Sequence, residues 1–109
     1  MDKKIYNKLV RDRIPEMIRQ TGNCQTKILD EQSYIFALKE KLIEESDEVR
    51  NAQSAEDLAE ELADVLEVME ALKGILGIST EQVERARAEK NRERGRFDKR
   101  VLLEYVEKN

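Results

Sequence analysis

The stretch EESDEVRNAQSAEDLAEELAD, residues 44–64, decides how the rest of the chain is interpreted. It contains two acidic pairs with the same internal spacing, Glu45 with Glu48 and Glu61 with Asp64, on either side of a short polar break. Residues three positions apart lie on the same side of an α-helix. The stretch therefore predicts two helices joined by a tight connection, each of which carries a pair of carboxylates on one side.

The first of these helices is expected to begin at Asp30 or Ser33 and to end near Asn51. Apolar residues recur along it at intervals of three and four, which is the pattern of a helix that buries one face. Glu45 occupies a position in this apolar stripe, whose other members are Ile35, Leu38, Leu42 and Val49. A carboxylate at such a position loses its hydration, which costs several kcal/mol unless the group is paired or bound to a metal.

The second helix is expected to begin after Ser54 and to end near Ile75, because Gly77 is a typical C-terminal stop. Asp57 follows Ser54 by three residues, an arrangement that resembles a capping box. Glu61 falls close to the centre of the apolar stripe of this helix, and the second acid of its pair lies at the edge of the stripe. Neither acid has a basic residue within one helical turn along the chain.

The segment before these helices is predicted to be partly irregular. Pro15 suits the first turn of a short helix, where its missing N–H costs little. Gly22 or Asn23 is expected to end that helix with a residue that tolerates a positive φ. Residues 25–29 are interpreted as a brief extended segment.

The segment after these helices begins with another helix start signal. Ser79 and Gln82 have the spacing of a capping box, which opens a third long helix over residues 80–94. Gly95 is expected to end this helix. The tail that follows, residues 97–106, is interpreted as an extended or short helical arm.

Length and composition favour one small all-α domain. The chain has 109 residues, too few for two ordinary cores, so residues 1–109 are interpreted as a single domain. One proline and four glycines among many helix-forming residues favour helix nearly throughout. Only 39% of the residues are apolar and 40% are charged, so such a unit buries little surface alone. We therefore expect an antiparallel helical bundle that is completed by oligomerisation.

Charge and residue usage argue against several classes of protein. The net charge is −4 with acidic and basic residues interleaved, whereas a nucleic-acid-binding protein usually has a basic stripe, so no nucleic-acid partner is expected. The single cysteine excludes a disulfide framework, and the absence of histidine removes the commonest general base. No apolar run approaches membrane-spanning length and none follows the N-terminus, so we expect no membrane partner and a cytoplasmic location.

The acidic pairs predict a metal site. If the two long helices pack antiparallel, as their short connection favours, the four acids Glu45, Glu48, Glu61 and Asp64 converge. Converging carboxylates repel one another and stay together around cations, and oxygen ligands without His or Cys select Mg²⁺, or Mn²⁺, over zinc. Mg²⁺ commonly takes further ligands from substrate phosphates. The alternative is two ordinary charged amphipathic helices, since 24 of the 109 residues are acidic.

The acids also follow a spacing that resembles a known family signature. The pattern EExxE, twelve intervening residues and then ExxD begins at Glu44 and ends at Asp64. It resembles the signature of the all-α nucleoside triphosphate pyrophosphohydrolases, which include MazG, the dimeric dUTPases and phosphoribosyl-ATP pyrophosphohydrolase. The stretch YNKLVRDRIP, residues 6–15, resembles the opening of the small single-domain MazG-like proteins, and KNRERGRF, residues 90–97, resembles their closing K-x-x-x-R-G-x-F.

This resemblance implies a fold and an activity. The fold would be a MazG-like helical bundle completed by a second subunit, as a homodimer or homotetramer. The activity would be Mg²⁺-dependent hydrolysis of a nucleoside triphosphate to the monophosphate and pyrophosphate, in a house-cleaning role on non-standard or excess nucleotides. The metal ligands implied by the resemblance are Glu45, Glu48, Glu61 and Asp64. Glu44 completes the expected catalytic set, and it orients a water, binds a second ion or is ordinary surface.

Basic residues at both ends of the chain are candidates to hold the substrate. Four of them would bind phosphate oxygens and stabilise the leaving pyrophosphate: Lys8, Arg11, Lys90 and Arg94. The alternative for each is an ordinary solvated surface charge. Lys90 and Arg94 share one helical face, where an anion between them would relieve their repulsion.

Three other functions remain open on the sequence. Phosphoribosyl-ATP pyrophosphohydrolase would perform the same chemistry on a histidine-pathway intermediate. A non-enzymatic helical dimerisation module would use the acids only to set pairing specificity, as coiled coils do. A nucleotide sensor would bind the substrate without cleaving it. Aromatic residues make up 5% of the chain and tryptophan is absent, so a base-stacking cage is not visible.

Overall fold

All regular secondary structure among residues 2–108 is helical. The computed structural model describes residues 2–108 and contains four helices and no strand in that range, so the all-α prediction is confirmed for it. The helices are α1 (Ile14–Ile18), α2 (Glu31–Asn51), α3 (Ala55–Leu76) and α4 (Thr80–Arg94). The chain divides into two units, the first ending at Gly77 and the second beginning at Ile78, and each is described by itself.

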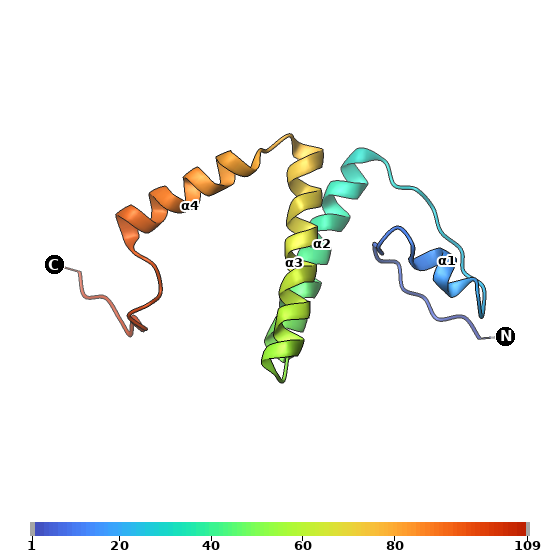
Figure 1. The fold of residues 1–109 in the computed structure, drawn as a ribbon, viewed down its shortest axis with the longest axis horizontal. Helices are drawn as coiled ribbons and strands as arrows, with labels where there is room; N and C mark the ends of the chain where they lie inside the picture. The colour runs from blue at the N-terminus through green and yellow to red at the C-terminus, as the bar shows by residue number, and fades with distance from the viewer. Residues whose placement is uncertain (1, 109) are drawn as a thin grey trace. The chain divides into compact units, whose positions relative to one another are not determined.

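Two long helices form the framework of the first unit. α2 and α3 lie side by side and run in opposite directions, joined by residues 52–54, as Figure 1 shows. Their contact buries Leu38 of α2 and Val68 of α3, which are 3% and 8% exposed and are the only buried apolar side chains among residues 2–108. The helical hairpin predicted from the acidic stretch is therefore present. The line of contact between its two helices, called the seam below, buries few apolar side chains.

Side-chain caps fix where both long helices begin. Asp30 accepts a hydrogen bond from the backbone N–H of Ser33 at 2.8 Å, which starts α2 at one of its two predicted positions. Ser54 accepts one from the N–H of Asp57 at 3.1 Å and starts α3 as predicted. α3 ends at Gly77, whose φ of 67° is the left-handed conformation that glycine adopts without strain.

The short first helix ends earlier than predicted. Pro15 lies in its first turn, as expected, but α1 stops at Ile18, so the predicted end at Gly22 or Asn23 is wrong. The chain leaves the helix through a non-helical turn in which the N–H of Gly22 donates to the Ile18 carbonyl at 2.9 Å. Backbone N–H groups of residues 19–22 donate to the carbonyls of Pro15, Met17 and Ile18, and no residue of this turn has a positive φ.

The second unit contains α4 and the tail. Ser79 and Gln82 form the predicted reciprocal capping box, and Gly95 follows the last helical residue with a φ of 82°. The tail after α4 has no regular structure through residue 108, and several of its apolar side chains are exposed. Within residues 2–108, no helix combines the length and apolar character needed to cross a membrane.

Candidate metal centre

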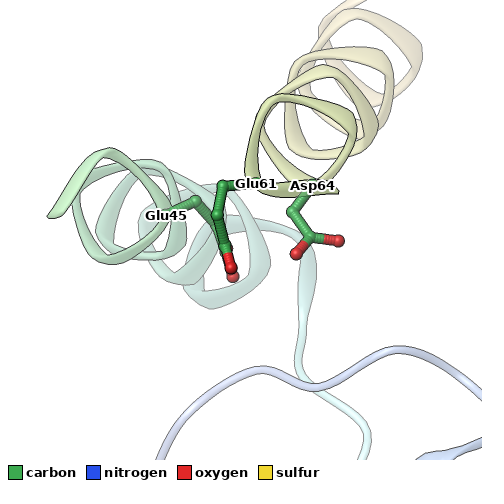
Figure 2. A group of neighbouring side chains, drawn as sticks. All are labelled: Glu45, Glu61 and Asp64. Carbon is green, nitrogen blue, oxygen red and sulfur yellow. The ribbon is translucent and has the colours of Figure 1, made fainter. Parts of the chain in front are cut away.

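Three carboxylates meet at the seam between the two long helices. Glu45 projects from α2, while Glu61 and Asp64 project from α3 one turn apart, and Figure 2 shows their side chains directed to the same side of the hairpin. One oxygen of each lies within 4.8 Å of an oxygen of the others. We call these residues the carboxylate cluster. Its members are separated in sequence, and the antiparallel packing of α2 against α3 brings them together.

Glu45 is the most buried member of the cluster. It is 9% exposed, because it occupies a position in the apolar stripe of α2 two turns after Leu38. Its carboxylate lies 3.5 Å from the ammonium group of Lys41, one turn earlier on the same helix. A carboxylate removed from water in this way needs a positive partner, and Lys41 supplies one.

The local field around Glu61 is negative. Loss of hydration and the charges of Glu48, Asp64, Glu45 and Glu60 raise the pKa of the Glu61 carboxyl above its ordinary value. Each of these contributions disfavours the ionised form. A cation placed among the three carboxylates would reverse the effect, because opposite charge favours ionisation.

Glu48 lies outside the carboxylate cluster. It is exposed on α2, and its oxygens are not within the 4.8 Å spacing that joins the other three predicted ligands. Its charge nevertheless acts on Glu61. Three of the four predicted ligands are thus brought together, and the fourth contributes from nearby.

The segment that precedes α1 supplies two cations to this region. Arg11 Nη2 lies 2.7 Å from Asp64 Oδ1, and Lys8 Nζ lies 3.0 Å from Glu44 Oε1. We call residues 6–13 the lead-in segment. Because Arg11 and Asp64 are 53 residues apart, no local spacing in the sequence could have indicated their pairing.

Glu44 is an ion-paired residue at the edge of the site. Burial alone would raise its pKa, but the hydrogen bond from Lys8 and the charges of Lys41 and Lys8 outweigh that effect and hold the pKa of the Glu44 carboxyl below its ordinary value. Lys41 Nζ lies 3.5 Å from Glu44 Oε1 and also contacts Glu45. Glu44 therefore stays ionised and connects the lead-in segment with α2.

Lys90 and Arg94 belong to the second unit. Both are exposed on α4, and they lie four residues apart near its C-terminal end. Arg94 lies in the last turn of α4, where a positive charge interacts favourably with the helix dipole.

The donor chemistry of the carboxylate cluster fits a hard divalent cation. All three groups offer carboxylate oxygens, and the chain has no histidine. Cys24 is occupied elsewhere, with its thiol 3.9 Å from the carbonyl of Pro15. Oxygen-only ligands suit Mg²⁺ or Mn²⁺, and Mg²⁺ tolerates a small set of protein ligands because it keeps several waters.

A pocket beside the cluster contains residues that the sequence did not single out as site residues. It has a volume of about 250 Å³ and is lined by the lead-in segment, by α2 and by α3. Its wall includes Tyr34 and Glu67 in addition to Glu45 and Asp64 of the cluster. The interval of eleven residues from Tyr34 to Glu45 is three helical turns, so this spacing was a signal for a shared face.

Comparisons of the chain with models of protein families, with curated proteins and with solved structures found no match.

Proposed function

We propose that this protein is a Mg²⁺-dependent nucleoside triphosphate pyrophosphohydrolase that also accepts Mn²⁺. It would convert a nucleoside triphosphate to the monophosphate and pyrophosphate, in a house-cleaning role on non-standard or excess nucleotides and at a cytoplasmic location. The observation that carries the proposal is the convergence of Glu45, Glu61 and Asp64 within 4.8 Å at the seam of two antiparallel helices. Three acids so close, in a chain without histidine, are suited to a hard cation and its phosphate ligands.

The cations beside the cluster support a phosphate substrate over a purely structural metal. Lys8 and Arg11 reach the acidic region from the lead-in segment, and both are about half exposed in their side chains, at 46% and 57%. A substrate phosphate could therefore reach their N–H groups from solvent. A guanidinium group binds phosphate oxygens in pairs, which fixes the orientation of the substrate.

The chain's own residues divide the chemistry among them. Glu45, Glu61 and Asp64 would hold the cation, while Glu48 would add its negative charge from nearby, and the bound cation would neutralise phosphate charge and acidify a water. The water oxygen bonds to the α-phosphorus and gives up its proton to bulk water as the bond to the α,β-bridging oxygen breaks, and pyrophosphate departs with that electron pair. Arg11 and Lys8 would stabilise the leaving charge. Glu44 would hold Lys8 in position.

The resemblance noted in the sequence supports the same activity and a MazG-like bundle. Such a bundle would need at least a second copy of the chain. In line with this, α3 carries an exposed apolar stripe at intervals of four residues, formed by Leu58, Leu62 and Leu66. We propose a homodimer or homotetramer in which copies cover this stripe.

The test is a substrate panel with Mg²⁺ and the common ribo- and deoxyribonucleoside triphosphates. Orthophosphate is measured before and after addition of inorganic pyrophosphatase, and we expect a signal only after the addition. Glu45→Gln and Glu61→Gln should each lower kcat/KM by at least about 100-fold, because changes even to the partners of metal ligands cost 10- to 100-fold. Glu40→Gln, an exposed acid on α2 outside the cluster, is the matched control and should retain activity.

The outcomes separate the alternatives. Orthophosphate without pyrophosphatase would mean cleavage at another bond and would contradict the proposal. Binding without turnover in single-turnover assays would identify a nucleotide sensor. Activity restricted to phosphoribosyl-ATP would identify the histidine-pathway enzyme, and full activity in Glu61→Gln would refute the assignment of the metal ligands.

A further inference from the structure

The pocket beside the carboxylate cluster opens directly onto it. Glu45 and Asp64 belong both to the cluster and to the pocket wall. The pocket extends from them along the seam toward Tyr34 on α2 and Ala71 on α3. At 1.5 Å per residue, Ala71 lies about 10 Å from Asp64 along the helix axis. A ligand held at the carboxylates by one end can therefore reach into the pocket with the other.

The character of the wall changes along this direction. Near the cluster it is charged, with Arg11 and Lys41 beside the carboxylates. Farther along it is apolar, and it includes the two buried residues of the seam, Leu38 and Val68. Tyr34, half-buried on α2, lies at that apolar part of the wall. The gradient suits a ligand with an anionic end and a flat, weakly polar end.

Two further acids line the same pocket. Asp12 comes from the lead-in segment and Glu67 from α3, and both are exposed. Within residues 2–108, neither carboxylate takes part in a side-chain hydrogen bond or an ion pair. Ionised carboxylates only accept hydrogen bonds. A ligand in this pocket is therefore met by acceptors that lack a protein donor.

We propose that this pocket receives the base of the nucleotide, with the ring of Tyr34 as its flat wall, and that Asp12 and Glu67 select bases that carry an exocyclic amino group. The inference rests on the proposed function, because it takes the phosphates to lie at the carboxylate cluster. An aromatic ring stacks on any base. An amino group on the base can donate a hydrogen bond to a carboxylate. A carbonyl oxygen at the same place cannot, because it and the carboxylate are both acceptors.

The discrimination is measured with pairs of substrates that differ only at that group. CTP and UTP form one pair and ATP and ITP the other, since each pair exchanges an amino group for a carbonyl. We expect the wild-type protein to favour CTP over UTP, and ATP over ITP, by about tenfold in kcat/KM, the value of one hydrogen bond to a charged acceptor. Glu67→Gln and Asp12→Asn supply an amide N–H and should bring at least one ratio close to one.

The role of Tyr34 is measured with variants that keep the helix intact. Tyr34→Leu removes the ring and should lower kcat/KM for every nucleotide about tenfold or more, chiefly through KM, while Tyr34→Phe keeps the ring and should remain near wild type. Phe36→Leu is the matched control, because Phe36 is an aromatic residue two positions away on α2 and is 66% exposed outside the pocket. It should leave all substrates unchanged.

The results distinguish failure of this inference from failure of the proposed function. Pyrophosphate release with equal CTP and UTP values, or Tyr34→Leu behaving like Phe36→Leu, overturns the base pocket and leaves the hydrolase proposal standing. If no nucleotide is cleaved, equilibrium dialysis of α,β-imido CTP and UTP with Mg²⁺ decides. Tighter binding of the CTP analogue that is weakened in Tyr34→Leu supports the pocket without hydrolysis. Equal binding of the two analogues, or no binding, overturns it.

Discussion

At the scale of single residues, the acids of the carboxylate cluster have unequal environments. Glu45 is buried and has Lys41 at 3.5 Å, and Asp64 has Arg11 at 2.7 Å. Glu61 is half-buried and forms no ion pair with a cation among residues 2–108, and its pKa is raised by lost hydration and by its acidic neighbours. Of the three members, Glu61 is therefore the carboxylate whose charge would gain most from a bound cation.

This imbalance predicts a pH dependence of stability in the metal-free protein. The folded-state pKa of Glu61 lies above its ordinary value of 4.5, so the folded chain holds this proton more tightly than the unfolded chain does. The stability that the protonated Glu61 carboxyl contributes to the folded protein is fully present below the unfolded-state pKa, and it is lost as pH rises through the folded-state pKa. Glu61→Gln has no proton to lose, so in EDTA it should become more stable than wild type as pH rises from about 4 to 7.

Urea unfolding of both proteins across that pH range measures the effect. Added Mg²⁺ should raise the stability of the wild-type protein and reverse the order, because a ligand that binds only the folded state stabilises it. Glu40→Gln on the exposed face of α2 serves as the control and should follow the wild-type curve. Parallel pH profiles for wild type and Glu61→Gln in EDTA would show that ionisation of Glu61 does not destabilise the folded protein.

The residue-level arrangement was predictable only in part. The place of Glu45 in an apolar stripe indicated its burial, because helical periodicity is a local property of the sequence. The pairing of Arg11 with Asp64 depends on how the lead-in segment returns to α3, which no local pattern encodes. The exclusion of Glu48 from the cluster likewise depends on the rotation of α2 about its axis, and a shared side of the helix was too coarse a criterion.

At the scale of elements, local chemistry fixes most helix boundaries. The starts at Ser54 and Ser79 were predictable because a cap needs only a side-chain oxygen three residues before a free N–H, and the same rule limited the start of α2 to Asp30 or Ser33. The stop at Gly77 was predictable for the same reason, since it needs one residue that adopts positive φ. The early end of α1 at Ile18 was not, because no strong local stop signal lies there.

The cap of α3 gives a quantitative prediction. Ser54→Ala removes the acceptor for the Asp57 N–H and should lower the free energy of unfolding by about 1 kcal/mol. Ser46→Ala is the matched control: the Ser46 hydroxyl donates to the Leu42 carbonyl at 2.8 Å inside α2, a bond that does not support the helix. Its effect should stay within about 0.5 kcal/mol. Urea denaturation measures both, and equal losses would contradict the assigned role of the cap.

At the scale of the whole molecule, the chain buries little of its apolar surface. Leu38 and Val68 are the only buried apolar side chains among residues 2–108, while large apolar residues of both long helices stay exposed. Phe36 and Ile43 on α2 are 66% and 60% exposed. Small domains with so thin a core usually depend on a partner, a metal or covalent links for stability. The composition of the chain already indicated that its core would be small. The identity of the exposed side chains could be seen only from the packing of α2 on α3.

Association through the apolar stripe of α3 is the prediction that follows at this scale. Leu62 and Leu66, which are 46% and 59% exposed, lie one turn apart on the face of α3 that α2 leaves open. The double variant Leu62→Glu with Leu66→Glu places two charges there, and burying them against another copy would cost more than the contact returns. Sedimentation equilibrium should find the wild-type protein as a dimer or larger species and the variant as a monomer with a lower unfolding temperature. Ile28→Glu changes an apolar residue that is 97% exposed outside the helices, so it should leave the assembly intact. A monomeric wild-type protein at micromolar concentration would contradict the role of the stripe, and the thin seam would then have to suffice for folding by itself.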